Sequence, residues 1–162
     1  MANTPFTLNP IGRCRADNAG FRLEIDPAYR AALRGLHGFS HLNVLWWCDS
    51  CDDPASRALL ETPNPYKKAP ESLGVFATRS PQRPNPIALT PIYVLSIDIE
   101  NGLIETPFLD AHDQTPILDI KPYHPAVDRV RDVRVPDWCR HWPQWYEESA
   151  NFDWGREFVH AR

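Results

Sequence analysis

Two polar segments carry the side chains best suited to bind a charged ligand. The first, Gly74–Thr90, is a short apolar run followed by a loop with prolines at positions 81, 84 and 86. Proline removes backbone freedom, so polar groups on this loop are held in place before a ligand arrives. The second, Leu109–Tyr123, opens with a turn rich in donors and acceptors. The polar residues of the loop are Arg79, Ser80, Gln82, Arg83 and Asn85, and those of the turn are Asp110, His112, Asp113, Gln114 and Thr115. Together they predict a polar pocket; the alternative is that these turns only satisfy their own backbones.

Other chemistries receive less support from the residue spacing. None of the 7 glycines forms a G-x-G-x-x-G or P-loop motif, which excludes the usual phosphate cradle at a strand–helix turn. Cys48 and Cys51 form a C-x-x-C pair, but the acidic residues that follow would raise the thiol pKa values and disfavour redox chemistry. A zinc site would need Cys139 and His141 as its second ligand pair. We expect reduced thiols and no metal.

The elements that must position these side chains are mostly short strands. Hydrophobic alternation and turn residues predict strands at Phe6–Arg15, Phe21–Ile25, Ser40–Cys48, Gly74–Thr78, Ile87–Glu100, Leu103–Leu109 and Ile117–Ile120. Asn101-Gly102 predicts a hairpin turn. One main helix is expected from Asp26, a capping residue before Pro27, to Gly38, and a short one around Arg57–Glu61.

The fold class that follows is mostly β. The chain has 162 residues, enough for one domain, and its 17 prolines disfavour long helices. A barrel would remove the exposed edges of such a sheet, so we expect a single-domain β-barrel over residues 1–135. Residues 136–162 form a tail with Trp138, Trp142, Trp145 and Trp154. We interpret this tail as an aromatic clasp that packs on the barrel or on a dimer partner, with a base-stacking platform as the alternative.

Charge and hydropathy bear on the compartment and the partners. The formal net charge is −4, so the chain lacks the overall basic excess usual for proteins that bind nucleic acid through phosphates. No apolar run approaches the roughly 20 residues needed to span a bilayer, and the N-terminus lacks the pattern of an export signal. We therefore expect a cytoplasmic protein with no membrane contact.

At FATRS (76–80), RPNPI (83–87) and DIKPY (119–123) the chain resembles the TsaA-like family of TrmO-type methyltransferases. The resemblance runs from about Ile11 to Val130. It implies a dimeric β-barrel with S-adenosylmethionine bound close to the subunit interface. It also implies methylation of an exocyclic amine, that of threonylcarbamoyl-adenosine beside the tRNA anticodon.

The resemblance also implies site residues. Arg79 matches an arginine that contacts the cofactor, and Leu89 matches an apolar position beside the adenosine. His112, Asp113, Gln114 and Thr115 match the family's D-G-T turn and its preceding residue, with Gln114 in place of glycine. Asp49 and Ser50 stand where a His-Gln pair is usual. A Pro-Arg-Gln loop is absent between Arg15 and Phe21, and the extra C-terminal domain of the longer tRNA enzymes is replaced by the Trp-rich tail.

The chemistry of methyl transfer suggests catalytic candidates. The sulfonium methyl is already activated, so the enzyme mainly has to align the acceptor and take its proton. Asn85 and Asp119 are the candidates for proton acceptor, with Lys121 and Tyr123 orienting the substrate. Three functions stay open: methylation of an RNA adenosine, methylation of a small molecule, and a non-enzymatic module that binds S-adenosylmethionine.

Overall fold

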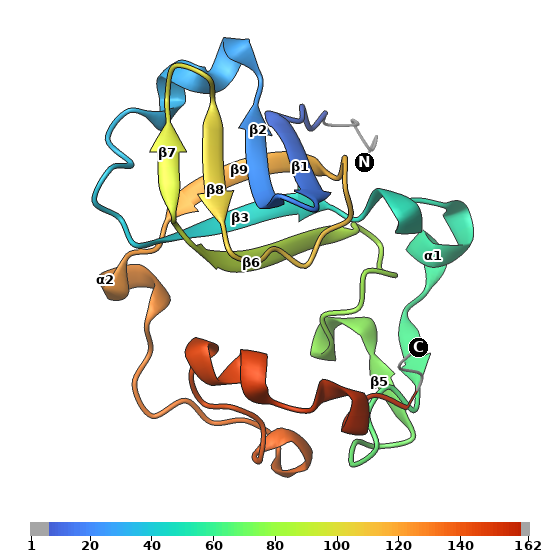
Figure 1. Ribbon diagram of the computed structural model, residues 1–162. Helices are drawn as coiled ribbons and strands as arrows, with labels where there is room; N and C mark the ends of the chain where they lie inside the picture. The colour runs from blue at the N-terminus through green and yellow to red at the C-terminus, as the bar shows by residue number, and fades with distance from the viewer. Residues whose placement is uncertain (1–6, 160–162) are drawn as a thin grey trace.

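The central feature of the computed structural model, which describes residues 7–159, is a seven-stranded antiparallel sheet. Its strand order is β6-β3-β9-β1-β2-β8-β7 (Figure 1). The strands are β1 (Gly12–Asp17), β2 (Gly20–Ile25), β3 (His41–Trp47), β6 (Ile87–Tyr93), β7 (Ser96–Asp98), β8 (Leu103–Thr106) and β9 (Pro116–Pro122). A second, two-stranded sheet pairs β4 (Glu61–Pro63) with β5 (Ser72–Gly74). The prediction of a mostly β fold is confirmed.

The sheet is open, so the prediction of a closed barrel is wrong. Its two outer strands, β6 and β7, follow each other along the chain and are separated only by Val94 and Leu95. The Val94 amide still bonds to Ser40 on the β3 side at 2.9 Å, whereas the Leu95 amide bonds to Glu105 of β8 at 2.9 Å. The single strand expected at Ile87–Glu100 is therefore divided into two strands, β6 and β7, which pair at opposite edges of the sheet. The outer strands meet end to end, and no ladder closes between them among residues 7–159.

Local turn chemistry explains the two hairpins. Gly20 has a φ of 114°, which only glycine adopts easily, and it closes the β1–β2 turn. Gly102, with a φ of 73°, closes the β7–β8 turn. The hairpin predicted at Asn101-Gly102 is present, but its loop runs over residues 99–102 because Asp98 accepts hydrogen bonds from the Asn101 backbone and side chain at 3.0 and 2.7 Å.

The helices are shorter than the periodicity predicts. The expected main helix begins after Asp26, as predicted, but it is a 3-10 helix, η1 (Pro27–Leu33), in which only Leu33 is buried. The other expected helix is α1 (Pro54–Ala58), capped by the Asp53 carboxylate. Of the strand expected at Gly74–Thr78, only Gly74 lies in a strand, as the last residue of β5, and a 3-10 turn, η3 (Val75–Ala77), follows it. The remaining short helices are η2 (Asp49–Cys51), α2 (Pro125–Asp128), η4 (Asp137–Cys139), η5 (Tyr146–Asn151) and η6 (Trp154–Arg156).

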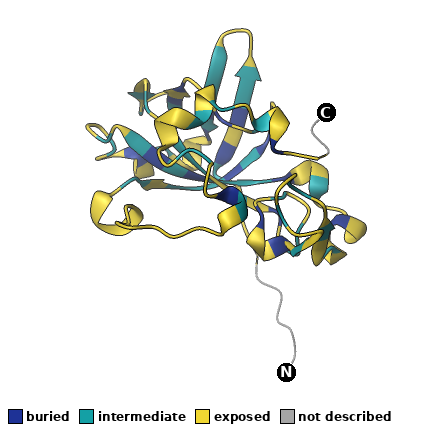
Figure 2. Cartoon of the chain, turned by 90° about the horizontal axis from the view of Figure 1, so that it is seen from below, coloured by how far each residue is buried: buried dark blue, intermediate teal, exposed yellow. Residues whose placement is uncertain are grey.

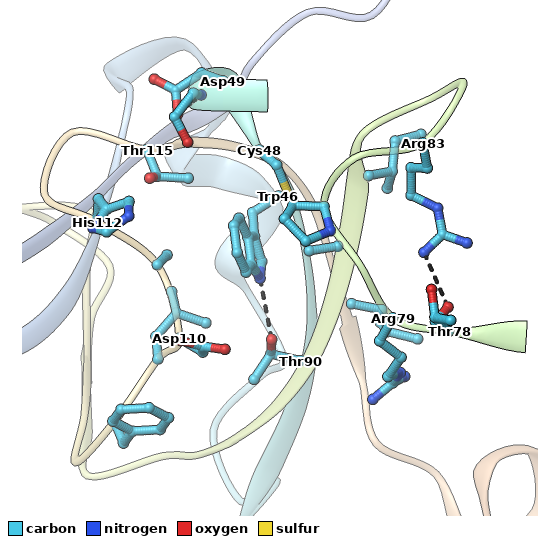
Figure 3. Close-up of a pocket in the computed structure, with 18 of the residues that line it drawn as sticks. Trp46, Cys48, Asp49, Thr78, Arg79, Arg83, Thr90, Asp110, His112 and Thr115 are labelled. Atoms are coloured by element: carbon cyan, nitrogen blue, oxygen red, sulfur yellow. Dashed lines mark hydrogen bonds between the residues drawn. The ribbon is translucent and has the colours of Figure 1, made fainter. Parts of the chain in front are cut away.

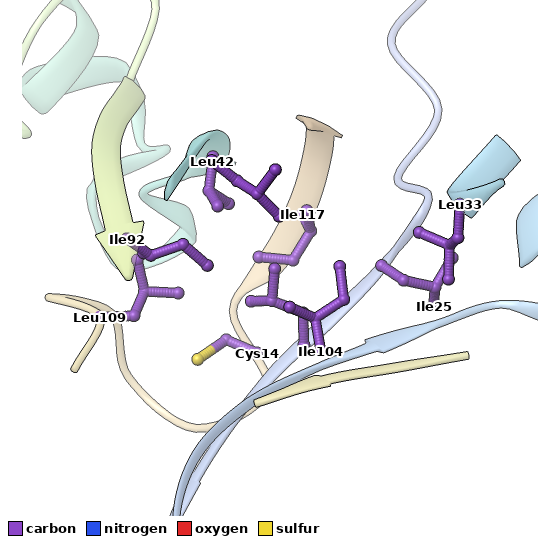
Figure 4. Close-up of a cluster of buried hydrophobic side chains, with 10 residues drawn as sticks. Cys14, Ile25, Leu33, Leu42, Ile92, Ile104, Leu109 and Ile117 are labelled. Carbon is purple, nitrogen blue, oxygen red and sulfur yellow. The ribbon is translucent and has the colours of Figure 1, made fainter. Parts of the chain in front are cut away.

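The core lies in the concave side of the curled sheet. Its largest fully buried side chains come from alternate positions of β2, β3, β6, β8 and β9, namely Leu23, Leu42, Val44, Ile92, Ile104 and Ile117, together with Leu109 (Figure 4). Burial of each such aliphatic side chain contributes about 1.5–3 kcal/mol. Figure 2 shows that buried residues concentrate in the strands, whereas most of the connecting segments are exposed.

The Trp-rich tail packs against a loop rather than against the sheet core. The Tyr66 ring stacks on Trp138 with centroids 5.3 Å apart and meets the edge of Trp142 at 5.0 Å. Trp142 in turn contacts Trp154 at 5.4 Å, and an isolated β-bridge joins Tyr66 to Phe158. In Figure 1 the tail runs from α2 to the region of β5. Residues 160–162 of the predicted tail and residues 1–6 of the predicted domain lie outside the described part, and the division at residue 135 stays a prediction.

Candidate functional site

A cavity of about 800 Å³ lies beside the end of β3. We call it the main cavity. Four parts of the chain form its walls: the end of β3 with η2, the proline loop after η3, the first half of β6, and the turn after β8 (Figure 3). Its lining residues are Phe21, Trp46, Cys48, Asp49, Ser50, Phe76, Thr78, Arg79, Pro81, Arg83, Ile87, Ala88, Leu89, Thr90, Phe108, Leu109, Asp110, Ala111, His112 and Thr115.

The floor of the main cavity is set by β3 and β6. The register of β3 against β9 shifts between Leu45 and Trp46, and this irregularity lies where Trp46 reaches the cavity. The Trp46 indole donates a hydrogen bond to the Thr90 hydroxyl at 3.1 Å, which fixes the ring across the strand pair. Beyond it, the Cys48 amide bonds to the Pro86 carbonyl at 2.8 Å and ties the end of β3 to the proline loop.

The proline loop supplies two arginines that play different parts. The Arg83 guanidinium donates to the backbone carbonyls of Thr78 and Ser80 at 3.5 and 3.4 Å, so it braces the loop. Arg79 is exposed in the cavity wall, and its guanidinium makes no ion pair or hydrogen bond within residues 7–159. Its five donors are therefore available to a ligand.

The opposite wall is acidic and polar. Asp110, His112 and Thr115 come from the turn after β8, and in Figure 3 they lie across Trp46 from the two arginines. Thr115 is buried, whereas Asp110 and His112 are exposed to the cavity. The site therefore places cationic groups on one side, carboxylate and imidazole groups on the other, and an aromatic surface between them.

The thiol in this site is unreactive. Burial, followed by the neighbouring Cys51, raises the pKa of Cys48 to about 11, so the group is neutral at physiological pH. All four cysteines are free, and no cluster of three metal-ligating side chains occurs in the described part of the chain. Cys139 bonds to the Pro136 carbonyl and His141 pairs with Glu157 at 2.9 Å, so both are engaged within the tail.

The structure brings six of the eight predicted cofactor residues to the main cavity. They are Asp49, Ser50, Arg79, Leu89, His112 and Thr115. The first and the last of them are 66 residues apart in the sequence. Asp113 and Gln114 do not line it. Asp113 instead accepts a hydrogen bond from the Ala16 amide at 3.1 Å and pairs with Arg15 at 3.6 Å.

Gln114 has a structural place in the turn. Its φ is 70°, in the left-handed region that favours glycine, and its amide bonds to the Cys14 carbonyl at 2.8 Å. The backbone thus keeps the shape that the family's D-G-T turn suggests, although the residue is not glycine. This turn holds Thr115 and His112 at the cavity.

The four predicted catalytic residues lie elsewhere in this chain. Asn85 is exposed on the proline loop but is not among the lining residues. Asp119 and Lys121 form an ion pair at 2.6 Å on β9, and Tyr123 lies against His41 with ring centroids 6.2 Å apart, near the far end of β3. One copy of the chain therefore does not bring Asp119, Lys121 and Tyr123 together with Arg79.

Several lining residues were not singled out from the sequence. The sequence predicts Asp110 and Arg83 only as polar residues of the two segments, and it does not predict Phe76 and Phe108 as site residues. Phe76 precedes Arg79 in the FATRS stretch, and its side chain is 80% exposed. An apolar residue at an exposed position of a polar motif is the signal by which the sequence could have identified it.

A family model described as the tRNA-methyltransferase O N-terminal domain matches residues 4–129, most of the chain. An S-adenosyl-L-methionine-binding protein of Archaeoglobus fulgidus is 36% identical over 135 residues, which are 82% of this chain and 91% of that protein. A longer probable S-adenosyl-L-methionine-binding protein of the same organism is also 36% identical, over 127 residues, but this chain covers only 30% of it.

Enzymes with a named tRNA activity are longer than the region of likeness. The tRNA (adenine(37)-N6)-methyltransferase of Escherichia coli is 35% identical over 104 residues, 63% of this chain and 43% of the enzyme.

Solved structures agree with these sequence matches. A TrmO crystal structure superposes with a TM-score of 0.64 at 29% identity, and TrmO from Pseudomonas aeruginosa superposes with a TM-score of 0.61 at 30% identity. They cover 83% and 81% of this chain, respectively, and 62% of each solved chain is matched. No helix of residues 7–159 has the length and apolar character required to cross a membrane. The family match, the likeness of fold and the FATRS, RPNPI and DIKPY motifs together show that the chain belongs to the TrmO family of S-adenosylmethionine-dependent methyltransferases.

Proposed function

We propose that the main cavity binds S-adenosylmethionine and that the protein transfers its methyl group. The observation that carries this proposal is the facing of Arg79 and Asp110 across an aromatic floor in a cavity of about 800 Å³. The cofactor needs these groups: a guanidinium for its carboxylate, a carboxylate for its ammonium or ribose hydroxyls, and aromatic faces for its adenine and sulfonium. The names of the archaeal relatives support this assignment.

The proposed methyl acceptor is the exocyclic amine of a modified adenosine beside the tRNA anticodon. The E. coli relative, whose name states this reaction type, supports it. The cavity would exclude water and align the amine with the sulfonium methyl, which is the main requirement for transfer. The amine becomes acidic as the new bond forms, so a carboxylate or amide oxygen suffices as proton acceptor. We place the protein in the cytoplasm, where such tRNAs are modified.

We further propose that the functional unit is a homodimer. Asn85, Asp119, Lys121 and Tyr123 remain our candidates for acting on the acceptor, yet one copy separates the last three from Arg79. A second copy would have to bring them to the cavity. β6 forms an outer edge of the sheet and exposes Ile87, Leu89 and Tyr93 on one face, which favours contact with another copy.

A small-molecule acceptor is the second candidate function. The net charge of −4 favours it, because a tRNA carries many phosphates and this chain has no overall basic excess. The cofactor site and the alignment chemistry would be the same. Only the class of acceptor differs between the two.

The test is formation of S-adenosylhomocysteine by the purified protein with total tRNA or with total small metabolites. We expect product with tRNA bearing threonylcarbamoyl-adenosine, and its loss in Arg79→Ala. Product only with the metabolites would replace the first acceptor by the second. Cofactor binding without turnover of tRNA or of the metabolites would support a non-enzymatic module that binds S-adenosylmethionine. Absence of cofactor binding would refute the proposal as a whole.

A further inference from the structure

A second cavity, of about 380 Å³, lies at the opposite end of β3. We call it the tail cavity, because the Trp-rich tail forms one of its walls. β3 runs from His41, which lines the tail cavity, to Trp47, beside the main cavity, so about 20 Å of strand separates the two at roughly 3.3 Å per residue. The lining residues are His41, Pro91, Tyr123, Asp128, Arg129, Val130, Val133, Gln144, Trp145, Tyr146 and Glu147. The family model ends at residue 129, so most of this wall is built by residues beyond the family match.

Aromatic rings define the tail cavity. The His41 ring lies at the centre and meets Tyr93, Tyr123 and Tyr146 in edge-to-face contacts, with centroids 5.3, 6.2 and 6.3 Å apart. Trp145 adjoins Tyr146 and is 62% exposed. Within the described residues no hydrogen bond occupies the Tyr123 and Tyr146 hydroxyls or the Trp145 indole N–H. The cavity therefore offers ring faces with free polar edges, which is the environment in which a heteroaromatic base stacks.

The charge at the cavity suits an anion attached to such a ring. Arg129 lines the cavity and has no ion pair among residues 7–159, and Arg131 and Arg134 follow it in the same exposed loop. Asp128 is already engaged: it accepts hydrogen bonds from the Asn43 side chain at 2.8 Å and from the His124 amide at 2.6 Å. Glu147 is the other acidic group in the wall, and Asp132 lies within the loop. A free guanidinium beside ring faces matches a phosphate next to a base.

We infer that the tail cavity binds a nucleotide, with its base against Trp145 and Tyr146 and its phosphate at Arg129. The volume falls within the range of about 300–1,000 Å³ found for small-molecule sites. A free nucleotide and a nucleotide within an RNA strand share this chemistry, and the experiment separates them. This inference goes beyond the proposed methyl transfer, because it concerns a site remote from the main cavity, with one wall built by the tail.

The experiment titrates the full chain, with and without saturating S-adenosylmethionine, with adenosine monophosphate and with a short single-stranded adenosine RNA. Calorimetry gives the affinity, and quenching of tryptophan fluorescence reports stacking. Trp145→Ala and Arg129→Gln are the test variants. Tyr29→Ala and Arg34→Ala are matched controls, since both residues are exposed in or next to η1, away from the cavity. Thermal unfolding of each variant verifies that it is folded.

We expect Trp145→Ala to weaken nucleotide binding by about five- to a hundredfold, the usual cost of losing a stacked base. Arg129→Gln should weaken it and reduce its dependence on salt. The controls should bind like the wild type. Binding of the mononucleotide and the RNA alike identifies a free nucleotide as a sufficient ligand, and binding of the RNA alone identifies the strand as the source.

Absence of binding by both ligands would overturn the inference, and so would binding that both test variants retain in full. Affinity for S-adenosylmethionine, measured in the same samples, is expected to stay unchanged in Trp145→Ala. A wild-type protein that binds S-adenosylmethionine but neither the mononucleotide nor the RNA would refute this inference and leave the proposed function standing. A wild-type protein that binds the nucleotide but not S-adenosylmethionine would refute the proposed function and support this inference.

Discussion

Arg79 and Arg83 leave the same proline-stiffened loop, yet only the Arg79 guanidinium makes no hydrogen bond within residues 7–159. Arg83 donates from Nη1 to the carbonyls of Thr78 and Ser80, and these bonds hold the loop in shape. Thr78 adds a hydrogen bond from its hydroxyl to the Val75 carbonyl at 2.9 Å, which anchors the base of the loop to η3. The position of Arg79 is thus set by its neighbours before a cofactor binds, and this preorganisation reduces the entropy lost on binding.

Replacement of Arg79 is expected to weaken the binding of S-adenosylmethionine. Arg79→Lys keeps the charge but loses the planar fork, and Arg79→Ala loses both. A charge-assisted hydrogen bond contributes about 1.5–3 kcal/mol, so we expect a loss of roughly ten- to a hundredfold for Arg79→Ala and less for Arg79→Lys. Calorimetric titration measures the affinity, with Arg131→Ala as the control outside the matched motifs. Wild-type affinity in Arg79→Ala would show that the cofactor site lies elsewhere.

Tyr66 links the tail to the same loop. Burial raises the pKa of Tyr66, and a hydrogen bond from the Arg79 backbone offsets part of that rise. Tyr66→Phe keeps the ring among the tail tryptophans and removes this contact. We expect cofactor affinity to fall by about two- to tenfold, the range for one neutral hydrogen bond, with little change in thermal stability. An unchanged affinity would mean that the hydroxyl does not help to position Arg79.

At the scale of elements, hydrogen bonds to one buried carboxylate stabilise the tail, in addition to its aromatic contacts. Glu157, which is 8% exposed, accepts hydrogen bonds from the Trp142 indole at 3.1 Å and from His141 at 2.9 Å. These bonds, first that of His141 and then that of Trp142, lower the pKa of Glu157. The ionised Glu157 carboxylate therefore links the segment after η4 to the end of η6.

The tail is therefore expected to loosen in acid. A lowered folded-state pKa means that Glu157 contributes stability above its unfolded pKa of about 4.3, and that this contribution is lost as the pH falls through the folded value below it. Tryptophan fluorescence should report a transition below about pH 4 in the wild type. Glu157→Gln should weaken or remove this transition, whereas exposed Glu71→Gln should keep it. An identical transition in Glu157→Gln would assign it to other carboxylates.

At the scale of the whole molecule, the open sheet leaves β6 as an unpaired edge. Because β6 and β7 meet end to end, neither covers the other, and the outer side of β6 with Leu95 beyond it stays exposed. Natural proteins cover or charge such edges, and this edge carries apolar side chains instead. A second copy placed there would bury them.

We accordingly expect a twofold dimer in solution. Light scattering at tens of micromolar should give twice the mass of 18.6 kDa. Leu95→Glu places a charge beside the edge of β6 and should shift the equilibrium toward the monomer. Leu60→Glu is the matched control, because Leu60 is similarly exposed but lies next to β4. A monomeric wild type would refute the dimer, and a dimer that tolerates Leu95→Glu would place its interface elsewhere.

The local pattern of residues was sufficient to predict most strands, the β7–β8 hairpin and the start of η1. Alternation of apolar residues and turn chemistry act between near neighbours, so β2, β3 and β9 appear close to their predicted positions. The motif at Arg79 likewise identified its cavity-lining partners Leu89, His112 and Thr115. These predictions depended on contacts within a few residues or on a long, specific motif.

Only the tertiary structure decided how distant segments combine. The break at Val94–Leu95 opens the sheet because two competing partners, Ser40 and Glu105, are far away in sequence. The pairing of Asp113 with Arg15 withdrew it from the cavity, and the docking of Trp142 on Tyr66 shaped the tail. Each outcome depends on packing between segments many residues apart, and the free energy of such contacts is not encoded in any local pattern.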